Sequence, residues 1–309
     1  MKNFKLIFGL LVAFLFLTFT NSLQAQYIIE QIESEIPINY ELIPEDIEFE
    51  VPEDEINFIL KIPESKLKEA ALAGGREIRE EKVTTYIDGE KFAVETESEE
   101  TGKTTMISST KTGVMYYIMW SQKKVIEIKP EDMDKIVKKS NDAIEKMLEN
   151  MSPEMKEQVR AEMEKEKNKS PVKYDAQLTG KKMKLYGFNC EEYRVNKNED
   201  VVIIWASNDK SGIIKEINRV SNKFDELFKS SEDEGVDEWQ LVPGKIPVQV
   251  RTYTSSMMMG EPVLLIQSIT KIEKKKPSAD KFRVPGKKEG FTKGSMMDMM
   301  MQIRSKDEG

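Results

Sequence analysis

The sequence predicts an α+β protein in which an antiparallel sheet is interrupted by two helical insertions. Apolar and polar residues alternate with the period of a β-strand through much of residues 82–128 and 182–272. Glycines and an Asp-Gly pair divide these runs at the spacing of hairpins. The period changes to that of an amphipathic helix over residues 131–167 and again over residues 213–227. We therefore expect one sheet domain over residues 56–293, with its main helical insertion at residues 131–167.

Residues 1–26 have the features of a cleaved secretory signal peptide. Lys2 and Lys5 precede an apolar run over residues 6–19, and Ala25 is a small residue suited to signal peptidase. The run is shorter than the about 20 residues that a membrane span needs. No cysteine follows directly after this run, so we do not expect a lipid-anchored lipoprotein. A retained N-terminal anchor is the alternative. The expected location is periplasmic or secreted, and the protein is at most peripheral to a membrane.

Residues 27–55 form an acidic segment without Lys or Arg, and three prolines recur along it, at Pro37, Pro44 and Pro52. Proline fixes φ and removes a backbone donor. We therefore expect an extended arm or an edge strand rather than a central strand of the sheet.

Residues 56–128 are expected to contain short strands with one helical turn between them. The first strand is predicted over residues 57–62, and the helical turn over residues 67–73, ending at Gly74 and Gly75. The Asp88-Gly89 pair predicts a tight hairpin turn between two alternating runs. The meander is expected to continue through strands at residues 104–108, 114–120 and 124–128.

Residues 131–167 are expected to form a helical hairpin, or a long helix broken at Pro153. Ser152 is a suitable N-cap, and proline is favoured at the first helical position. The apolar face is rich in methionine, which most often marks a face packed on the core. A flexible binding face is the alternative, because methionine adapts to irregular partners. The face consists of Met133, Ile136, Val137, Ile144, Met147, Leu148 and Met151.

A second hairpin is expected over residues 182–207, with a short polar turn over residues 196–200. It contains the only cysteine, Cys190, which we expect to be buried or half-buried. An intermolecular disulfide and a reactive thiol are the alternatives, but the neighbours Glu191 and Glu192 would raise the pKa of the thiol. The second strand is apolar on both faces and should be central in the sheet. Val201, Ile203 and Trp205 lie on one face, and Val202 and Ile204 on the other.

The last part of the chain is expected to return to the sheet. An amphipathic helix over residues 213–227 precedes two long strands over residues 239–253 and 262–272. Residues 230–238 form an acidic loop that lacks the ligand order of a calcium site. Residues 294–309 are rich in methionine and are expected to be a disordered tail.

The stretch from Gly187 to Tyr193, followed by Trp205, resembles the motif G-Y/F-x-C-x-x-Y … W of an exported bacterial family catalogued as a domain of unknown function. The family is similar in architecture to the LolA-like periplasmic lipoprotein carriers. The resemblance implies a curled antiparallel sheet, an incomplete barrel, with helical insertions packed on its concave face. It implies no reaction, because the family has none established. Further segments resemble family motifs in the same order: Leu178-Thr179-Gly180, Met151-Ser152-Pro153-Glu154-Met155, Gly244-Lys245-Ile246-Pro247-Val248, and Phe282-Arg283-Val284-Pro285 with Gly290-Phe291.

The composition argues against several chemistries. The chain has no histidine, which removes Ser-His-Asp and Cys-His nucleophilic sites and the commonest zinc ligand. Glycine-rich phosphate and dinucleotide motifs are absent. The formal net charge is −8, from 47 basic and 55 acidic residues, which argues against nucleic acid and anionic membranes as partners. We expect neither an enzyme nor a bound cofactor.

The leading hypothesis is a non-enzymatic exported envelope protein that binds or carries a hydrophobic ligand, such as a lipid or the acyl chain of a lipoprotein. A structural or interaction protein of the envelope is one alternative. A Cu(I)-binding protein is another, because thioethers are soft ligands. The predicted ligand-lining residues are Met115, Tyr117, Met119, Met147, Met151 and Trp205, and the alternative copper ligands are Met296, Met297, Met299, Met300 and Met301.

Overall fold

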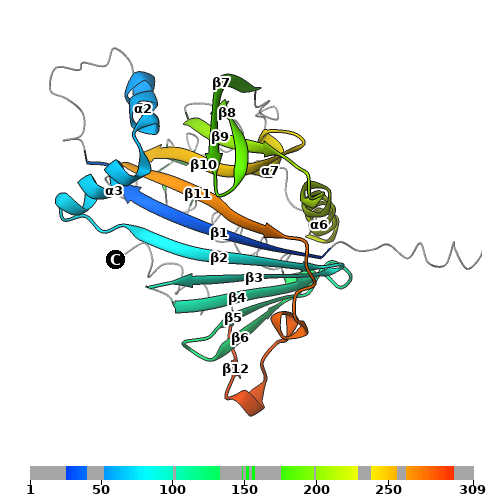
Figure 1. The fold of residues 1–309 in the computed structure, drawn as a ribbon. Helices are drawn as coiled ribbons and strands as arrows, with labels where there is room; N and C mark the ends of the chain where they lie inside the picture. Colours follow the sequence, from blue (N-terminus) through cyan, green and yellow to red (C-terminus); the bar gives the residue numbers. More distant parts are fainter. Residues whose placement is uncertain are drawn as a thin grey trace, which may run out of the picture.

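The computed structural model describes residues 26–39, 52–99, 102–132, 148, 151–152, 155–156, 175–197, 200–228, 238–255 and 262–295. These residues form one twelve-stranded sheet (Figure 1). Its order is β12-β6-β5-β4-β3-β2-β1-β11-β10-β9-β8-β7. The strands are β1 (Gln26–Pro37), β2 (Arg79–Asp88), β3 (Lys91–Ser98), β4 (Gly102–Ser109), β5 (Met115–Met119), β6 (Lys124–Ile128), β7 (Asp175–Leu185), β8 (Phe188–Lys197), β9 (Asp200–Asn208), β10 (Lys245–Ser255), β11 (Pro262–Glu273) and β12 (Thr292–Lys293).

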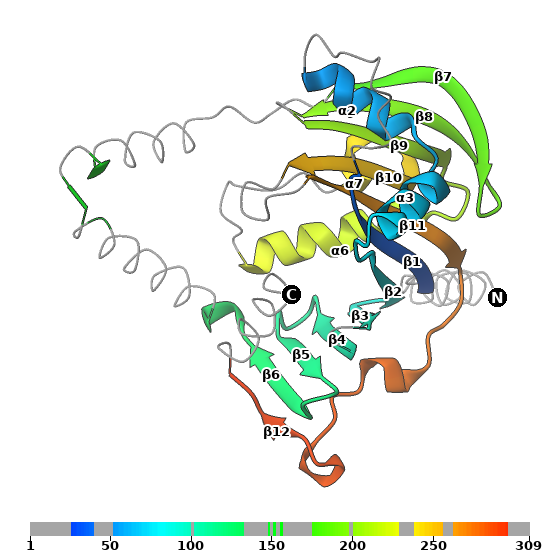
Figure 2. The same ribbon diagram turned by 90° about the vertical axis from the view of Figure 1, so that its left-hand side faces the viewer.

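This sheet corrects the expected fold class. Every neighbouring pair is antiparallel except β12 and β6, which are parallel, so the sheet is mixed. β12 and β7 form its two separate edges, and Figure 2 shows that the sheet does not close on itself. The described helices are few, and they do not form the expected layer packed on a concave face. The expectation of a curled antiparallel incomplete barrel with such a layer was therefore wrong.

β1 corrects the expected acidic arm. It pairs with β2 on one side and β11 on the other, so it is a central strand and the sheet begins at Gln26 rather than at residue 56. Tyr27 and Ile29 alternate with less buried residues, and Ile36 is fully buried. The first proline, Pro37, is the last residue of the strand, where it interrupts no ladder. A proline at this position does not argue against a central strand, because the alternating run that precedes it forms the strand.

Two helices follow where the sequence predicted a strand and a single turn. α2 (Pro52–Lys61) replaces the strand predicted at residues 57–62, and α3 (Glu64–Ala73) confirms the helical turn that ends at Gly74. Pro52 occupies the first helical position, acidic residues follow it, and Lys61 lies in the last turn. This arrangement complements the helix dipole. The sequence therefore contains helix signals at both ends of α2, although its short apolar run is also typical of a strand.

The cysteine-containing stretch is a three-stranded meander rather than one hairpin. Tyr186 and Gly187 have φ values of 48° and 88° and make the two-residue turn between β7 and β8. Positive φ at both positions is the geometry that a tight hairpin of this twist requires. Gly187 therefore reverses the chain within residues 182–196, which the sequence predicted to be a single strand before the turn at residues 196–200. The predicted position of β9 in the interior of the sheet is confirmed, between β8 and β10.

Two cores lie at opposite ends of the central strands (Figure 1). α2 and α3 cover the end of β1 near Ile36, where Ile59 and Leu67 contribute to one cluster. α6 (Ile213–Phe228), the predicted amphipathic helix, lies at the end near Tyr27. The Tyr27 hydroxyl donates to the Ser211 carbonyl at 2.6 Å, just before α6 begins. β1 thus connects the two cores. A fourth helix, α7 (Glu238–Leu241), is a single turn.

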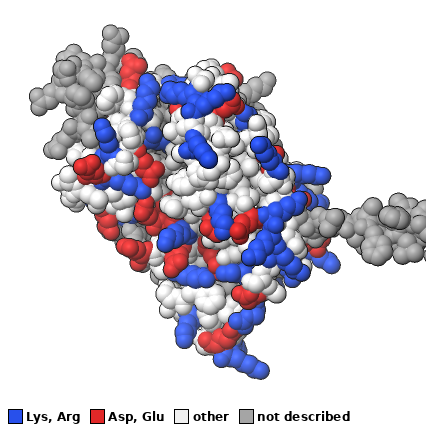
Figure 3. Space-filling model, in the orientation of Figure 1, with Lys and Arg blue, Asp and Glu red and all other residues white. Residues whose placement is uncertain are grey.

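The segment after β11 crosses the outside of β3–β6 and ends in β12. It contains two short 3-10 helices, η2 (Ala279–Phe282) and η3 (Lys287–Glu289). Phe291 packs edge-on against Trp120, with ring centroids 5.4 Å apart. Figure 3 shows Lys and Arg side chains gathered along the right side of the molecule and at its lower tip, where this segment runs. Among the described residues, no helix has the length and apolar character needed to cross a membrane.

Candidate functional site

Three of the predicted ligand-lining residues lie together on β5. Met115, Tyr117 and Met119 alternate along the strand and therefore share one face. Their direct partners on β6 include Ile128 opposite Met115 and Ile126 opposite Tyr117. These five side chains form a cluster separate from the other cores, which we call the β5–β6 apolar face. Met119, Ile126 and Ile128 are buried, and Met115 and Tyr117 are half-buried.

The opposite face of the same strands is closed by the segment after β11. Ile118 on β5 belongs to a cluster with Ile107, Phe291 and the partly buried Val284. The described part of the chain therefore supplies a cover for one side of β5 and β6. The β5–β6 apolar face contains described side chains from those two strands alone. Met115 and Tyr117 remain partly exposed on this face, which makes it the candidate site for an apolar group.

The structure does not bring the remaining predicted residues to this face. Trp205 lies on β9, seven strand spacings from β5, which is about 34 Å measured along the sheet. It belongs to the core beside α6. Met151 is half-buried, and its amide donates to the Leu148 carbonyl at 3.0 Å. Met147 and the alternative copper ligands Met296, Met297, Met299, Met300 and Met301 lie outside the described residues, as do most of the helical insertion and the acidic loop.

A polar row under α2 and α3 was not predicted. Cross-strand pairing aligns six residues on one face, from Arg194 on β8 to Glu80 on β2. The neighbouring row includes Glu192, Trp205, Gln249 and Ser268. We call these two rows the polar band. Its polar members are Glu192, Arg194, Gln249, Arg251, Ser268, Ser34 and Glu80.

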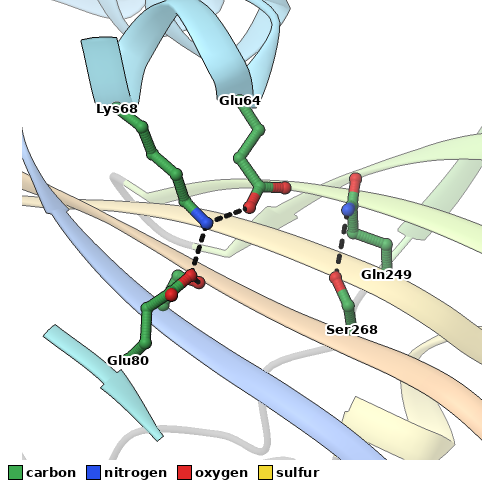
Figure 4. Close-up of polar contacts among 6 residues, drawn as sticks. Glu64, Lys68, Glu80, Gln249 and Ser268 are labelled. Carbon is green, nitrogen blue, oxygen red and sulfur yellow. Dashed lines mark hydrogen bonds and ion pairs between the residues drawn. The ribbon is translucent and has the colours of Figure 1, made fainter. Parts of the chain in front are cut away.

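Arg251 is the central charge of the polar band. It is 8% exposed, and its Nη2 donates to the Ile62 carbonyl at the joint between α2 and α3, at 2.7 Å. Its Nε is buried without a hydrogen-bond partner. Burial lowers the pKa of this guanidinium, while the negative charges of Glu64 and Glu192 act in the opposite direction. Beside it, Gln249 donates to the Ser268 hydroxyl at 3.0 Å in a fully buried contact (Figure 4).

The remaining contacts of the polar band attach the two helices to the sheet. Arg194 donates to Asn57 on α2. Lys68 on α3 lies 2.8 Å from Glu64 and 2.5 Å from Glu80 (Figure 4). The hydrogen bond from Lys68 lowers the pKa of Glu80, against the effect of its partial burial. Since α2, the joint and α3 each have one such contact, we interpret the polar band as an anchor for the helices.

In the sequence, the residues of the polar band on β10 have the pattern of a strand with one face in water. Gln249 and Arg251 alternate with Val248 and Val250, a pattern typical of a strand with one solvent-facing side. The helices that cover this side come from residues 52–73, far away in sequence. Periodicity alone cannot distinguish a polar face in water from one that is covered and hydrogen-bonded.

Cys190 has the properties of an inert structural thiol. It is 2% exposed and packs in the same core as Trp205. Burial raises its pKa to about 11, although a backbone hydrogen bond from Leu185 partly opposes this shift. Since the thiolate is the nucleophile, Cys190 is unsuited to covalent chemistry near neutral pH. Within the described ranges, Asp, Glu and Cys side chains also form no group of three that would hold a metal ion.

We expect Cys190 to resist thiol reagents in the folded protein. Labelling with a maleimide near neutral pH should be slow, because both burial and the raised pKa suppress the thiolate, and denaturation in guanidinium chloride should make it fast. The labelled fraction is read by intact-mass spectrometry over time. A rate in the native state equal to that of the denatured chain would contradict the buried position.

The comparisons with known proteins add no family. No protein-family model and no curated protein matches the chain. Two solved structures of PNGF-II, in space groups C2 and P21, align with TM-scores of 0.27 and 0.25 at 9% and 8% sequence identity. Each alignment covers 90% of this chain, which spans only about a third of the PNGF-II chain, 32% and 33% respectively. Similarity this low establishes no shared fold.

Proposed function

We propose that this chain is an exported, non-enzymatic binding protein that holds an apolar ligand, such as a lipid acyl chain, against the β5–β6 apolar face. The observation that supports the proposal is the cluster of Met115, Tyr117, Met119, Ile126 and Ile128, which is separate from the cores of the sheet. Met and Ile side chains contribute contact area but no acid–base chemistry. Two methionines also allow the face to adapt to ligands of different shape.

The size of the face fits an extended hydrocarbon chain. β5 and β6 have five residues each, and a strand of this length spans about 17 Å. Burying about ten methylene groups at about 0.8 kcal/mol each would contribute about 8 kcal/mol before the costs of ordering the ligand. That magnitude alone corresponds to a dissociation constant of about 1 μM, and the ordering costs make the expected binding weaker than this. It suits a protein that must both take up and release its ligand.

The test is binding of a dansyl-labelled fatty acid, followed by the increase in dansyl fluorescence. Met115→Glu introduces a charge at a half-buried position of the face, and we expect its dissociation constant to rise by at least about tenfold. Met183→Glu is the matched control, because Met183 lies on the edge strand β7 and is 43% exposed. We expect it to leave the affinity unchanged.

Two results would contradict the proposal. One is the absence of saturable binding by the wild-type protein, combined with the absence of a co-purifying lipid in native mass spectrometry. The other is the same affinity in both variants, which would move the bound fatty acid away from β5 and β6. Circular dichroism on each variant separates a local loss of binding from a loss of fold.

A further inference from the structure

The segment from Lys271 to Lys293 has a net charge opposite in sign to that of the whole chain. It contains nine basic and three acidic residues, a net charge of +6 in a chain whose total is −8. The rest of the chain therefore has a net charge of −14. The expectation that the protein avoids anionic surfaces was based on the total net charge. The total does not show that basic residues are concentrated in this one segment. Charges further away than about 8 Å are largely screened at physiological salt, so the local charge governs contact with a surface.

Many of these cations are free to meet a partner. Ion pairs neutralise three of them. Lys271 pairs with Glu30 and Glu273, Lys281 pairs with Glu95, and Arg283 pairs with Glu289. The others are exposed, and in the described part of the chain none lies within ion-pair distance of a carboxylate. We call this set the basic band. It consists of Lys274, Lys275, Lys276, Lys287, Lys288 and Lys293.

The basic band is held in place by the fold. Lys274 lies over the Tyr27 ring, with its Nζ 5.9 Å from the ring centroid. At the other end, Glu289 accepts from the Gly286 amide at 3.0 Å, and the Thr292 amide donates to the Lys123 carbonyl at 2.9 Å. Figure 3 shows the resulting blue areas along the right side and at the lower tip. The lysines are thus presented on an ordered segment that is attached to the sheet at both ends.

From these observations we infer that the basic band is a docking surface for an anionic lipid bilayer. Lysines on an exterior surface gain energy from the negative potential of such a bilayer, while their alkyl stems tolerate the interface. The band also ends beside the candidate ligand site. Thr292 and Lys293 of β12 pair with Lys124 and Val125 of β6, the strand that contributes Ile126 and Ile128 to the β5–β6 apolar face. The segment itself packs on the opposite side of β5 and β6, so docking would bring acyl chains to the β12–β6 edge that the band and the candidate site share.

This position favours a bilayer over a soluble polyanion as the partner. A nucleic acid or acidic polysaccharide would use the same cations but would have no relation to the adjacent apolar face. The docking surface itself does not depend on the ligand site, and the two proposals can fail separately.

The experiment is flotation of the full-length mature protein with vesicles. Vesicles of equal parts phosphatidylglycerol and phosphatidylcholine are compared with pure phosphatidylcholine, at low and high salt. We expect binding only to the anionic vesicles, and release by high salt. The variant K275Q/K276Q/K287Q/K288Q removes four free cations. At roughly a fivefold change for each lysine near the surface, we expect at least about a 100-fold loss of partitioning.

The matched control is K61Q/K66Q/K182Q/K184Q, which changes the net charge equally on α2, α3 and β7 and should bind like the wild type. Equal binding by both variants would overturn the proposal, and so would binding to phosphatidylcholine alone. Binding to dextran sulfate without binding to anionic vesicles would overturn the assignment to a membrane. If vesicle binding behaves as expected in a protein that does not bind the dansyl fatty acid, the docking surface is supported and the ligand site is not.

Discussion

Replacing Ile36 by alanine is expected to lower the free energy of unfolding by about 2–5 kcal/mol, and Ile29→Ala should have a similar effect. Both side chains are almost fully buried on β1, and they lie in different cores, Ile36 under α2 and α3 and Ile29 near α6. Each truncation removes apolar contacts and leaves a cavity that the surrounding strands cannot fill. Urea denaturation followed by circular dichroism measures the change.

The control for this prediction is Leu265→Ala on the neighbouring strand β11. Leu265 is 38% exposed, so its truncation should cost less than about 1 kcal/mol. An extended acidic arm outside the sheet, one of the two forms that the sequence predicted, would give no loss of stability for Ile29→Ala and Ile36→Ala. Equal midpoints for the wild type and these two variants would therefore contradict the central position of β1.

Replacing Arg251 by alanine is expected to lower the free energy of unfolding by about 3 kcal/mol. The change removes a charge-assisted hydrogen bond to the Ile62 carbonyl and leaves this half-buried acceptor without its partner. It also removes the methylene stem of a side chain that is only 8% exposed. Arg251→Met restores the stem without the donor, so it should recover part of the loss but not all of it.

Arg283→Ala is the matched control for Arg251→Ala. Arg283 makes a 2.7 Å ion pair with Glu289, but its side chain is 61% exposed. Exposed pairs of this kind contribute little, and we expect no measurable change in the urea midpoint. If Arg251→Ala were as stable as Arg283→Ala, the polar band would not anchor α2 and α3. Full recovery in Arg251→Met would show that packing, rather than the hydrogen bond, accounts for the effect.

Local patterns were sufficient where neighbours in sequence are also neighbours in the sheet. The hairpin turn at Gly89 and Glu90, directly after Asp88, the alternating strands on both sides of it and the amphipathic helix α6 all follow from short-range sequence patterns. The predicted grouping of Met115, Tyr117 and Met119 on one face follows for the same reason, since a strand fixes the face of every second residue. Their role in binding remains a prediction.

Long-range contacts account for most of what the sequence did not reveal. β1 is central only because β11, more than two hundred residues later, supplies its second partner. Arg251, at the centre of the polar band, is buried where the joint between α2 and α3 lies over it. Trp205 was assigned to the same cavity as Met115 because both are apolar, but their strands lie far apart in the sheet order. Composition contains no information about that separation.

The strand order also restricts when the protein can complete its fold. β2 to β6 and β7 to β11 are two runs of strands that each pair in sequence order, and β1 is the only strand between them. The pairing of Ile28 with Glu273 closes a loop of most of the chain. Such long-range closure is slow, because its entropy cost precedes any gain in contacts. During synthesis, which proceeds from the N-terminus, the first strand would therefore wait for nearly the last one, with an unpaired edge exposed in the meantime. A nascent chain of this topology would depend on protection from aggregation until its C-terminal strands arrive.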